Sequence, residues 1–342
     1  MYLSMVVFEE CLAEYHPRMT GHSDLIKIKF MGVQEAMEGQ EYLPDHMLLE
    51  HVEYFVSHPV PAAWGCLCIG EPPEDLFKNN ICLIFPENTD RTSLYHDVQK
   101  IFFLYNSWEM EIRKAMQRNA TLEEMCNLCI PIFEKPIFIH DRNNELLAIA
   151  NEMAGQFSWQ YDETFDKYYL PLEILNTFKS SDEYHKTLHT YGAHVFSAKA
   201  TGYRTLYVNL RIEWVYVGRV CLDEIGTPIR KRDYELLEFF ADNIALAMQQ
   251  GMLLVSDVSN VLSILFKEMI DGKSYTKNQL AKPFSYYKWH IDDMFQCITI
   301  FCRKSDNAIH TATNLTHRLA NMFPNSCVFR NEYQIILVLN AE

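Results

Sequence analysis

Apolar residues recur at alternating steps of three and four along the stretch from Tyr234 to Met269. This spacing is typical of a helix packed along a partner, and it predicts one helix of about 54 Å at 1.5 Å per residue. We expect such a helix to connect two domains and to pass a change from one to the other. The apolar positions are Tyr234, Leu237, Ala241, Ile244, Met248, Gly251, Val255, Val258, Leu262, Leu265 and Met269. The alternative is two helices, over 230–250 and 257–271, interrupted at Gly251.

A second heptad predicts a helix over 93–117 with Ser93 as its N-cap. Two heptad helices in one chain favour a homodimer. The residues expected at its interface are Ile101, Trp108, Leu237, Ile244, Met248, Val255, Leu262 and Leu265. Further apolar residues at 102–104 widen the apolar face of the helix predicted over 93–117, and a wider face equally suits a helix buried within one chain.

Residues 1–92 are predicted to form a small α/β domain. Short apolar runs bounded by Pro and Gly indicate strands at 25–30, 64–69 and 81–85, with an amphipathic helix over 46–55. Cys66 and Cys68 are expected to lie on one strand, to face opposite sides of it and to serve in packing.

Residues 93–120 are read as the connecting helix, and 121–250 as a domain of antiparallel strands with flanking helices, an α+β fold. The run beginning at Thr121 makes a capping box for a helix ending near Phe133. The expected elements after it are strands at 136–140 and 146–150, a polar and aromatic helical region at 161–189, strands at 194–198, 205–212 and 215–223, and a closing helix. Residues 251–342 are predicted to hold helices at 276–289 and 307–322, a strand at 295–302, and a hairpin at 326–339. This last domain ends directly after a strand, so we expect it to be cut short.

Composition narrows the functional classes. A length of 342 residues suggests two or three domains. A net charge of −15 disfavours nucleic-acid binding by this chain. The N-terminus lacks the basic region of a signal peptide, and no apolar run has membrane-spanning length. The expected location is therefore the cytoplasm, with no membrane partner and with the ten cysteines as reduced thiols.

With these patterns in place, the chain resembles bacterial regulators of the PucR-like and CdaR-like group. The resemblance to a GAF domain lies in Leu-Glu-Glu-Met-Cys-Asn-Leu (122–128), in the first hairpin over 136–150, and in Val-Tyr-Val-Gly-Arg-Val-Cys-Leu-Asp-Glu (215–224). Residues 257–342 resemble the degenerate GGDEF-like domain of these regulators, from Val-Leu-Ser-Ile-Leu-Phe-Lys-Glu-Met-Ile-Asp-Gly (261–272) onward. Together the two segments cover about two thirds of the chain.

Two departures from the family pattern limit what the resemblance implies. The hairpin that should carry Gly-Gly-Asp-Glu-Phe reads Phe329-Arg-Asn-Glu-Tyr333, so cyclic-dinucleotide synthesis lacks its carboxylates and glycine turn. The family's C-terminal helix-turn-helix does not occur in the sequence. The resemblance therefore implies the sensory and dimerising region of a transcriptional regulator, which contacts DNA only through a region outside this chain.

The candidate effector site lies on the strand 205–212. Because side chains alternate along a strand, Tyr207, Asn209 and Arg211 share one face, opposite Leu206, Val208 and Leu210. Polar anchors in an apolar pocket are typical of small-molecule sites, and Arg211 is suited to an anionic or polar effector. The residues expected to bind it are Tyr168, Tyr169, His194, Tyr207, Asn209 and Arg211. The alternative is a solvated outer face of the sheet.

Catalytic and metal chemistry have weaker support. Glu183, His185, His189 and His194 form the best metal-like cluster, because histidines four residues apart project from one helix face. The pair Cys126 and Cys129 lies in a helix without a second Cys-x-x-Cys, so we expect it to be packed. No nucleophile elbow, P-loop or dinucleotide fingerprint occurs, so we expect no enzymatic activity, no metal and no cofactor. The alternatives are a metal-dependent hydrolase or deaminase of a small metabolite that uses the histidine cluster, and a dimerisation scaffold without an open pocket.

Overall fold

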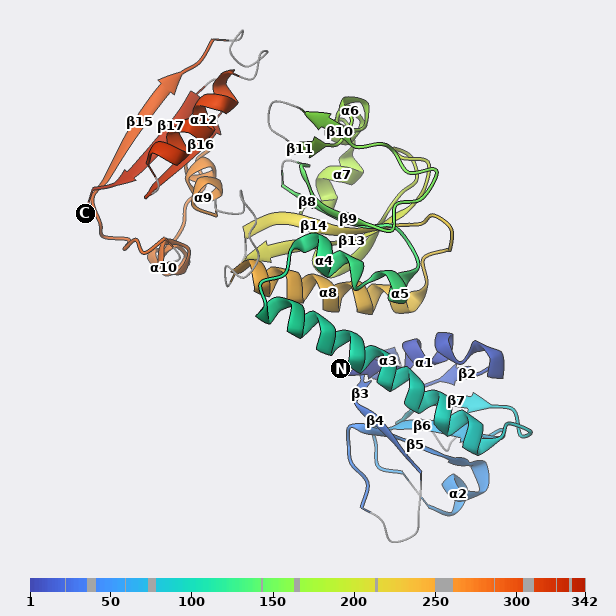
Figure 1. The fold of residues 1–342 in the computed structure, drawn as a ribbon. Helices are drawn as coiled ribbons and strands as arrows, with labels where there is room; N and C mark the ends of the chain where they lie inside the picture. The colour runs from blue at the N-terminus through green and yellow to red at the C-terminus, as the bar shows by residue number, and fades with distance from the viewer. Residues whose placement is uncertain are drawn as a thin grey trace.

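The computed structural model describes most of the chain as three sheets of three to five strands and two smaller two-stranded sheets, with their helices (Figure 1). The described residues are 1–21, 23–35, 41–58, 60–72, 78–142, 144–162, 167–212, 215–249, 261–285, 287–303, 311–323, 325–331 and 334–341. The predicted α+β class is confirmed, since helices pack on sheets in each part. No helix of these residues is long and apolar enough to cross a membrane.

The N-terminal sheet is mostly parallel, with the strand order β2-β7-β6-β5-β4. Its strands are β2 (Arg18–Thr20), β4 (Gly32–Glu35), β5 (His46–His51), β6 (Gly65–Ile69) and β7 (Ile81–Phe85), and only β2 runs antiparallel to its neighbour. Its other elements are β1 (Leu3–Ser4), α1 (Met5–Cys11), η1 (Ala13–Tyr15), η2 (Ser23–Lys27), β3 (Lys29–Phe30) and α2 (Val52–Ser57). Every residue of β6 and β7 is buried, as expected of parallel strands covered on both faces.

Two predictions for this part were wrong. The helix expected over 46–55 is the strand β5 followed by the short helix α2. Met47, Leu48 and Leu49 are consecutive and all buried, which a strand covered on both faces requires and a one-sided helix does not. The strand expected over 25–30 is a 3-10 helix followed by the two-residue strand β3, which pairs with β1.

The thiols of β6 also differ from the prediction. Cys66 and Cys68 lie in the same cluster, together with Cys82 of β7, and do not face opposite sides. The physical reason is that residues two apart on a strand share a face. All three side chains are buried, and the expected packing role is unaffected.

The helix predicted over 93–117 is α3 (Arg91–Gln117). Its N-cap is Asp90, not Ser93: the Asp90 carboxylate accepts a hydrogen bond from the Ser93 backbone N–H at 2.7 Å. The seam side chains are buried within the chain. Trp108, for example, lies against Phe133 and Phe239, with ring centroids 6.1 and 5.3 Å away.

The central sheet is antiparallel, with the order β12-β13-β14-β8-β9. Its strands are β8 (Ile137–Asp141), β9 (Leu146–Ala150), β12 (Ala193–Phe196), β13 (Thr205–Ile212) and β14 (Val215–Asp223). Thr121 and Glu124 form the predicted capping box of α4 (Leu122–Asn127), and α5 (Ile130–Phe133) follows. In Figure 1, α4, α5 and α8 (Lys231–Gln249) lie on one side of this sheet, and α6 (Leu172–Lys179) and α7 (Asp182–Thr187) on the other.

The helical region predicted over 161–189 is helical only in its second half, so this prediction was wrong in part. The segment begins with the hairpin β10 (Gln160–Asp162) and β11 (Lys167–Tyr169), in which Tyr161 pairs with Tyr168, and only then continues into α6 and α7. Tyrosine favours strands, and the aromatic density that suggested a helix face fits a hairpin as well. Phe165 and the neighbouring acidic residues lie outside the described residues.

The heptad pattern over 234–269 falls on α8 and on α9 (Val261–Ile270). Residues 250–260, which include Val255 and through which one continuous helix was expected, lie outside the described residues. Leu237 and Ile244 of α8 are buried, and α8 packs on β13. Leu262 and Leu265 of α9 are buried too, and α9 packs on β16. The seam residues therefore already have partners within one chain. The same is true of the other expected interface residues, Ile101, Trp108 and Met248.

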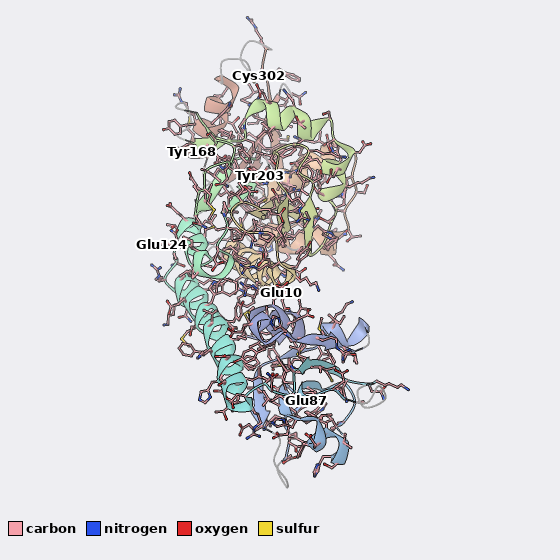
Figure 2. The ribbon with its side chains drawn as sticks, turned by 90° about the vertical axis from the view of Figure 1, so that its right-hand side faces the viewer. Glu10, Glu87, Glu124, Tyr168, Tyr203 and Cys302 are labelled. Carbon is pink, nitrogen blue, oxygen red and sulfur yellow. The ribbon has the colours of Figure 1, made fainter. Side chains whose placement is uncertain are left out.

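The N-terminal segment is docked on the start of α8. The carboxylate of Glu10 accepts the backbone N–H groups of Lys231 and Arg232 at 2.9 and 3.1 Å, which are among the unpaired donors of the first helical turn. Lys29 adds an ion pair to Glu235 at 3.1 Å. Figure 2 labels Glu10 at this junction.

The C-terminal part has the elements that the pattern predicts. A three-stranded antiparallel sheet has the order β15-β17-β16, with helices packed on it. Its further elements are α10 (Lys277–Ser285), β15 (Phe295–Phe301), α12 (Thr311–Met322), β16 (Ser326–Asn331) and β17 (Gln334–Asn340).

Candidate functional site

A small cavity lies on the face of the central sheet that α6 and α7 cover. Its volume is about 40 Å³, whereas one water needs roughly 10–15 Å³ and ligand pockets occupy about 300–1,000 Å³. The cavity therefore has room for a few waters, and a metabolite would have to displace part of the cover. Its lining residues are Phe138, His140, Phe157, Leu170, Phe178, Tyr184, Phe196, Thr201, Thr205, Tyr207, Arg219 and Cys221.

Strand register brings the lining side chains together. Cys221 of β14 pairs with Tyr207 of β13 and with Phe138 of β8, and Arg219 pairs with Asn209 and with His140. Paired residues project to the same face of a sheet, so these six side chains form two rows beneath α7.

Close strand packing beside Arg219 requires a residue without a side chain. A Cβ atom on the preceding Gly218 would lie 2.3 Å from the backbone oxygen of His140. A bulge between Leu210 and Arg211 lies opposite this glycine. The backbone is thus arranged locally so that β14 approaches β8 closely where Arg219 projects into the cavity.

Arg219 is the charged group of the cavity, and it is 4% exposed. Its Nη2 donates to the Thr187 hydroxyl at 3.1 Å, while its Nε has no hydrogen-bond partner among the described residues. The guanidinium carbon lies 4.7, 5.4 and 5.7 Å from the ring centroids of Tyr207, Tyr184 and Tyr216. Cation–π contacts of this kind partly offset the loss of hydration.

Two other buried groups in this region have shifted pKa values. Burial lowers the pKa of His140 to about 3, and the nearby positive charge of Arg219 lowers it further. His140 is therefore neutral near pH 7, and its Nδ1 lies 2.7 Å from the backbone oxygen of Asp141. Burial raises the pKa of Asp223 to about 6, although Gln156 and Thr205 donate hydrogen bonds to its carboxylate at 3.0 and 2.7 Å.

These two shifts predict opposite pH dependences of stability. The pKa of His140 is lower in the folded state than its ordinary value of 6.5, so its contribution is present above pH 6.5 and is lost as the pH falls toward 3. The pKa of Asp223 is raised, so its contribution is present below its ordinary value of 3.8 and is lost as the pH rises through 6. Each group changes the free energy of unfolding by up to about 1.4 kcal/mol per pH unit.

Between pH 4 and 6 the two contributions therefore cancel in part. Relative to wild type, Asp223→Asn should lose more stability as the pH falls from 6 to 4, and His140→Gln should lose more as it rises from 4 to 6. Urea unfolding at a series of pH values measures both slopes. Slopes of the same sign for the two variants would contradict the assignment.

The predicted face of β13 is covered rather than solvated, so the alternative of an outer face is wrong. Tyr207 lines the cavity. Asn209 donates to the backbone oxygens of Thr187 and Thr190 at 2.7 and 3.1 Å, and Arg211 donates to that of Leu188 at 2.7 Å. Asn209 and Arg211 thus hold the C-terminal end of α7 over the sheet, where the last carbonyls of a helix lack intrahelical donors.

The other three residues expected to bind the effector are not among the described residues that line the cavity, although the His194 ring centroid lies 6.2 Å from that of Tyr207. Tyr168 is half exposed and packs on Tyr161 in the hairpin, with ring centroids 5.0 Å apart. Tyr169 belongs to the same hairpin and is bridged to Glu145. His194 is exposed on β12, with its Nε2 3.0 Å from the backbone oxygen of Tyr191. Of the six predicted residues, only Tyr207 is among the described residues that line the cavity.

The histidine cluster is not assembled as expected. The helix α7 ends at Thr187, so His185 and His189 do not share a helical face. Glu183 accepts hydrogen bonds from the backbone and hydroxyl of Ser197 at 2.9 and 2.7 Å. Across the described part of the chain, no group of three or more His, Cys, Asp or Glu residues could hold a metal ion.

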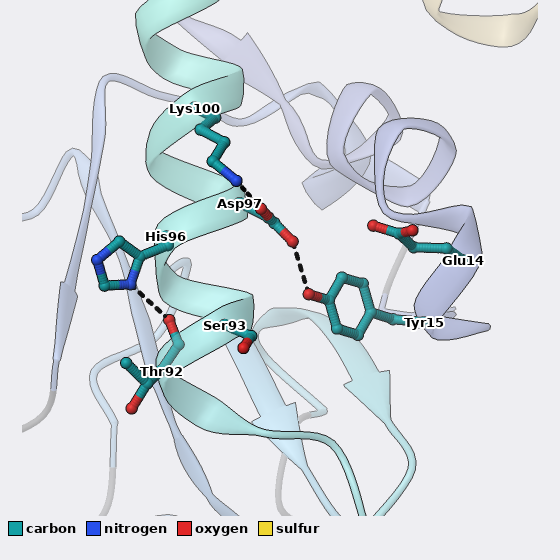
Figure 3. Close-up of a pocket in the computed structure, with 7 residues that line it drawn as sticks. All are labelled: Glu14, Tyr15, Thr92, Ser93, His96, Asp97 and Lys100. Carbon is teal, nitrogen blue, oxygen red and sulfur yellow. Dashed lines mark hydrogen bonds and ion pairs between the residues drawn. The ribbon is translucent and has the colours of Figure 1, made fainter.

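A second, wider depression of about 640 Å³ lies between α3 and the 3-10 helix η1 (Figure 3). Two of its charges are paired with one another: Asp97 accepts from Lys100 at 2.7 Å, and it also accepts from the Tyr15 hydroxyl at 2.6 Å. The hydrogen bond to Asp97 raises the pKa of Tyr15 to about 12. A wide depression lined mainly by polar side chains is a weaker ligand site than the enclosed, aromatic-walled cavity on the central sheet.

Comparison with known proteins gives structural likenesses only. No family model and no curated protein matches the chain. The cofactor-binding GAF domain of the nutrient sensor CodY from Clostridium difficile is similar at 12% identity and a TM-score of 0.30, over 42% of this chain and 96% of that one. A phycoerythrobilin-bound GAF domain from a cyanobacterial phytochrome is similar at 9% identity and a TM-score of 0.33, over 42% and 94%. A GAF domain/HD domain protein from Geobacter sulfurreducens is similar at 12% identity and a TM-score of 0.25, over 37% and 89%. Likenesses at these identities and scores assign no function to the chain.

Proposed function

We propose that the central domain is a GAF-like sensor that binds a small molecule in the cavity beneath α7, and that the chain is the sensory region of a cytoplasmic transcriptional regulator. The observation that carries the proposal is the cavity itself. It combines aromatic walls with one buried, incompletely bonded charged group, which is the composition of small-molecule sites. Its cover consists of the short helices α6 and α7, and such elements open at low cost in free energy.

The chemistry of the cavity supports binding rather than catalysis. Burial raises the pKa of the Cys221 thiol, so it is a poor nucleophile near pH 7. Burial lowers the pKa of His140 to about 3, so it is a weak base. The metal-dependent hydrolase or deaminase considered as an alternative finds no ligand cluster among the described residues.

The output of the sensor is proposed to pass through α8. Arg219, Asn209 and Arg211 all hold the end of α7. Five residues beyond Leu188, the backbone N–H of Ala193 donates to Glu238 of α8 at 2.7 Å. A ligand that moves the end of α7 would therefore alter the support of α8, provided that it binds the two arrangements with different affinity. Contact with DNA is proposed to require a region outside this chain.

The homodimer stays a prediction. Because the expected interface residues are buried within one chain, an interface between two chains has to use other side chains. Light scattering measures the mass in solution.

A thermal-unfolding screen against purines, diacids and aromatic acids tests the sensory function. At least one class should raise the midpoint of wild type. Cys221→Met fills the cavity with apolar atoms and leaves its charge unchanged, so this variant should lose the increase. Cys297→Met, at an exposed position of β15, is the matched control and should keep it. A stabilising compound that acts equally on wild type and Cys221→Met would place its binding elsewhere and refute the sensor cavity.

A further inference from the structure

Arg219 is a buried cation without a buried anion. Among the described residues no carboxylate forms an ion pair with it, and the acidic residue nearest in sequence, Asp223, is engaged with Gln156 and Thr205. A guanidinium stays protonated in proteins, so its charge is present in the folded state. Its partners are the Thr187 hydroxyl and the faces of three tyrosine rings, and the nearby Tyr216 hydroxyl also stabilises its charge.

The surroundings of Arg219 favour a ligand with a negative charge. Burial, together with the charge of Arg219, lowers the pKa of His140, which removes a second positive charge from the cavity but supplies no negative one. Arg219 lines the cavity, and its Nε donor is unused. A buried donor without a partner costs free energy, and an acceptor brought by a ligand removes that cost.

From this geometry we infer that the ligand of the cavity is an anion, a carboxylate on a flat apolar body, and that Arg219 is its charge partner. The inference rests on the proposed sensory function. The guanidinium offers a planar fork that matches a carboxylate. The walls contributed by Phe138, Phe157, Phe178 and Phe196 suit a flat apolar group. Arg211, which the sequence favoured for this role, already bonds to Leu188 and lies 4.7 Å from the Tyr191 ring, outside the cavity lining.

Binding of a carboxylate would also change the contact between Arg219 and α7. The Nη2 atom now donates to Thr187, the last residue of that helix. A carboxylate that takes Nε and one N–H of Nη2 in a bidentate pair reorients the guanidinium plane, so the hydrogen bond from the other N–H of Nη2 to Thr187 has to change with it. The Arg219 guanidinium is therefore the point at which ligand charge is converted into a change at the end of α7.

The test compares benzoate with benzamide, which has nearly the same shape without the charge. Calorimetry on the full chain should show binding of benzoate to wild type at millimolar concentration and a preference over benzamide of at least about tenfold, the value of one charge-assisted bond. Arg219→Met should remove the preference. Arg219→Lys should keep part of it, because it retains the charge and loses the fork. Arg211→Met is the matched control and should retain the full preference.

The outcomes separate the inference from the proposed function. If wild type binds both probes equally and Cys221→Met abolishes that binding, the sensor cavity stands and the anion assignment fails. Equal preference for benzoate in wild type and Arg219→Met would show that the charge partner lies elsewhere. Absence of binding by benzoate would overturn the assignment as well. Circular dichroism of each variant, compared with wild type, shows that the substitutions act on the site and not on folding.

Discussion

Lys135→Met is expected to lower the free energy of unfolding by about 3–5 kcal/mol, the usual cost of leaving one partner of a buried ion pair alone. Lys135 and Asp233 are both fully buried, with Nζ and Oδ2 2.9 Å apart. The pair joins the start of β8 to the first turn of α8. Removing the ammonium leaves the Asp233 carboxylate buried, and within the described part of the chain its one remaining donor is the Arg230 backbone N–H at 2.9 Å. Urea unfolding at pH 7 measures the loss.

The second partner supplies an internal control. Adding Asp233→Asn to Lys135→Met removes the orphaned charge, so the double variant should recover most of the lost stability. Lys114→Met breaks the exposed pair with Glu111 on α3 and should cost about 0.5 kcal/mol or less. A loss below about 1 kcal/mol for Lys135→Met would show that the buried pair contributes little.

Ile244→Asp is expected to unfold the central domain, with a loss above about 4 kcal/mol, because it buries a carboxylate without a partner. Ile244 is fully buried in α8 beneath the central sheet. The heptad pattern alone would predict a different result, a folded monomer released from a dimer. Circular dichroism and light scattering on the same sample distinguish the two, since only unfolding removes the helical signal.

Leu246→Asp is the matched control. Leu246 lies two residues further along the same helix and is 43% exposed, so the same substitution should change the free energy of unfolding by about 0.5 kcal/mol or less. If Ile244→Asp stays folded with half the mass of wild type, the residue lies between two chains and the intramolecular packing described above is incorrect.

The sequence predicts strands well where apolar runs are short and bounded. The strands 81–85, 146–150, 205–212 and 215–223 have the predicted bounds, because turn residues flank each run. The segment 46–51 was taken for a helix because a buried parallel strand shows no alternation that separates it from a buried helix. Heptad spacing has a similar ambiguity. A helix that packs on a sheet of its own chain needs the same apolar stripe as one in a coiled coil, and α8 uses its stripe in this way.

The candidate site could be predicted only in part. Alternation along β13 correctly identified a buried polar face that includes Tyr207. It did not identify Arg219, because the register of β13 and β14 shifts by one between Leu210 and Arg211. Without that bulge Arg219 would pair with Val208 and project to the opposite face of the sheet. A bulge leaves little trace in a single sequence beyond Gly218, which stands where β14 approaches β8 most closely.

Under the proposed sensory function, the cap that Glu10 places on α8 connects the N-terminal segment to the cavity. Glu10 accepts a hydrogen bond from the first turn of α8. Further along the same helix, Glu238 accepts one from the backbone N–H of Ala193, six residues beyond the end of α7. Linkage is reciprocal, so if a ligand in the cavity changes how tightly α8 holds the N-terminal segment, the docking of that segment must change the affinity for the ligand by the same factor. If the proposed output through α8 is right, affinities measured on a fragment that begins at 121 would therefore describe a domain in which α8 has lost its Glu10 cap. A partner that pulls residues 1–11 away would act as an effector of the cavity without entering it.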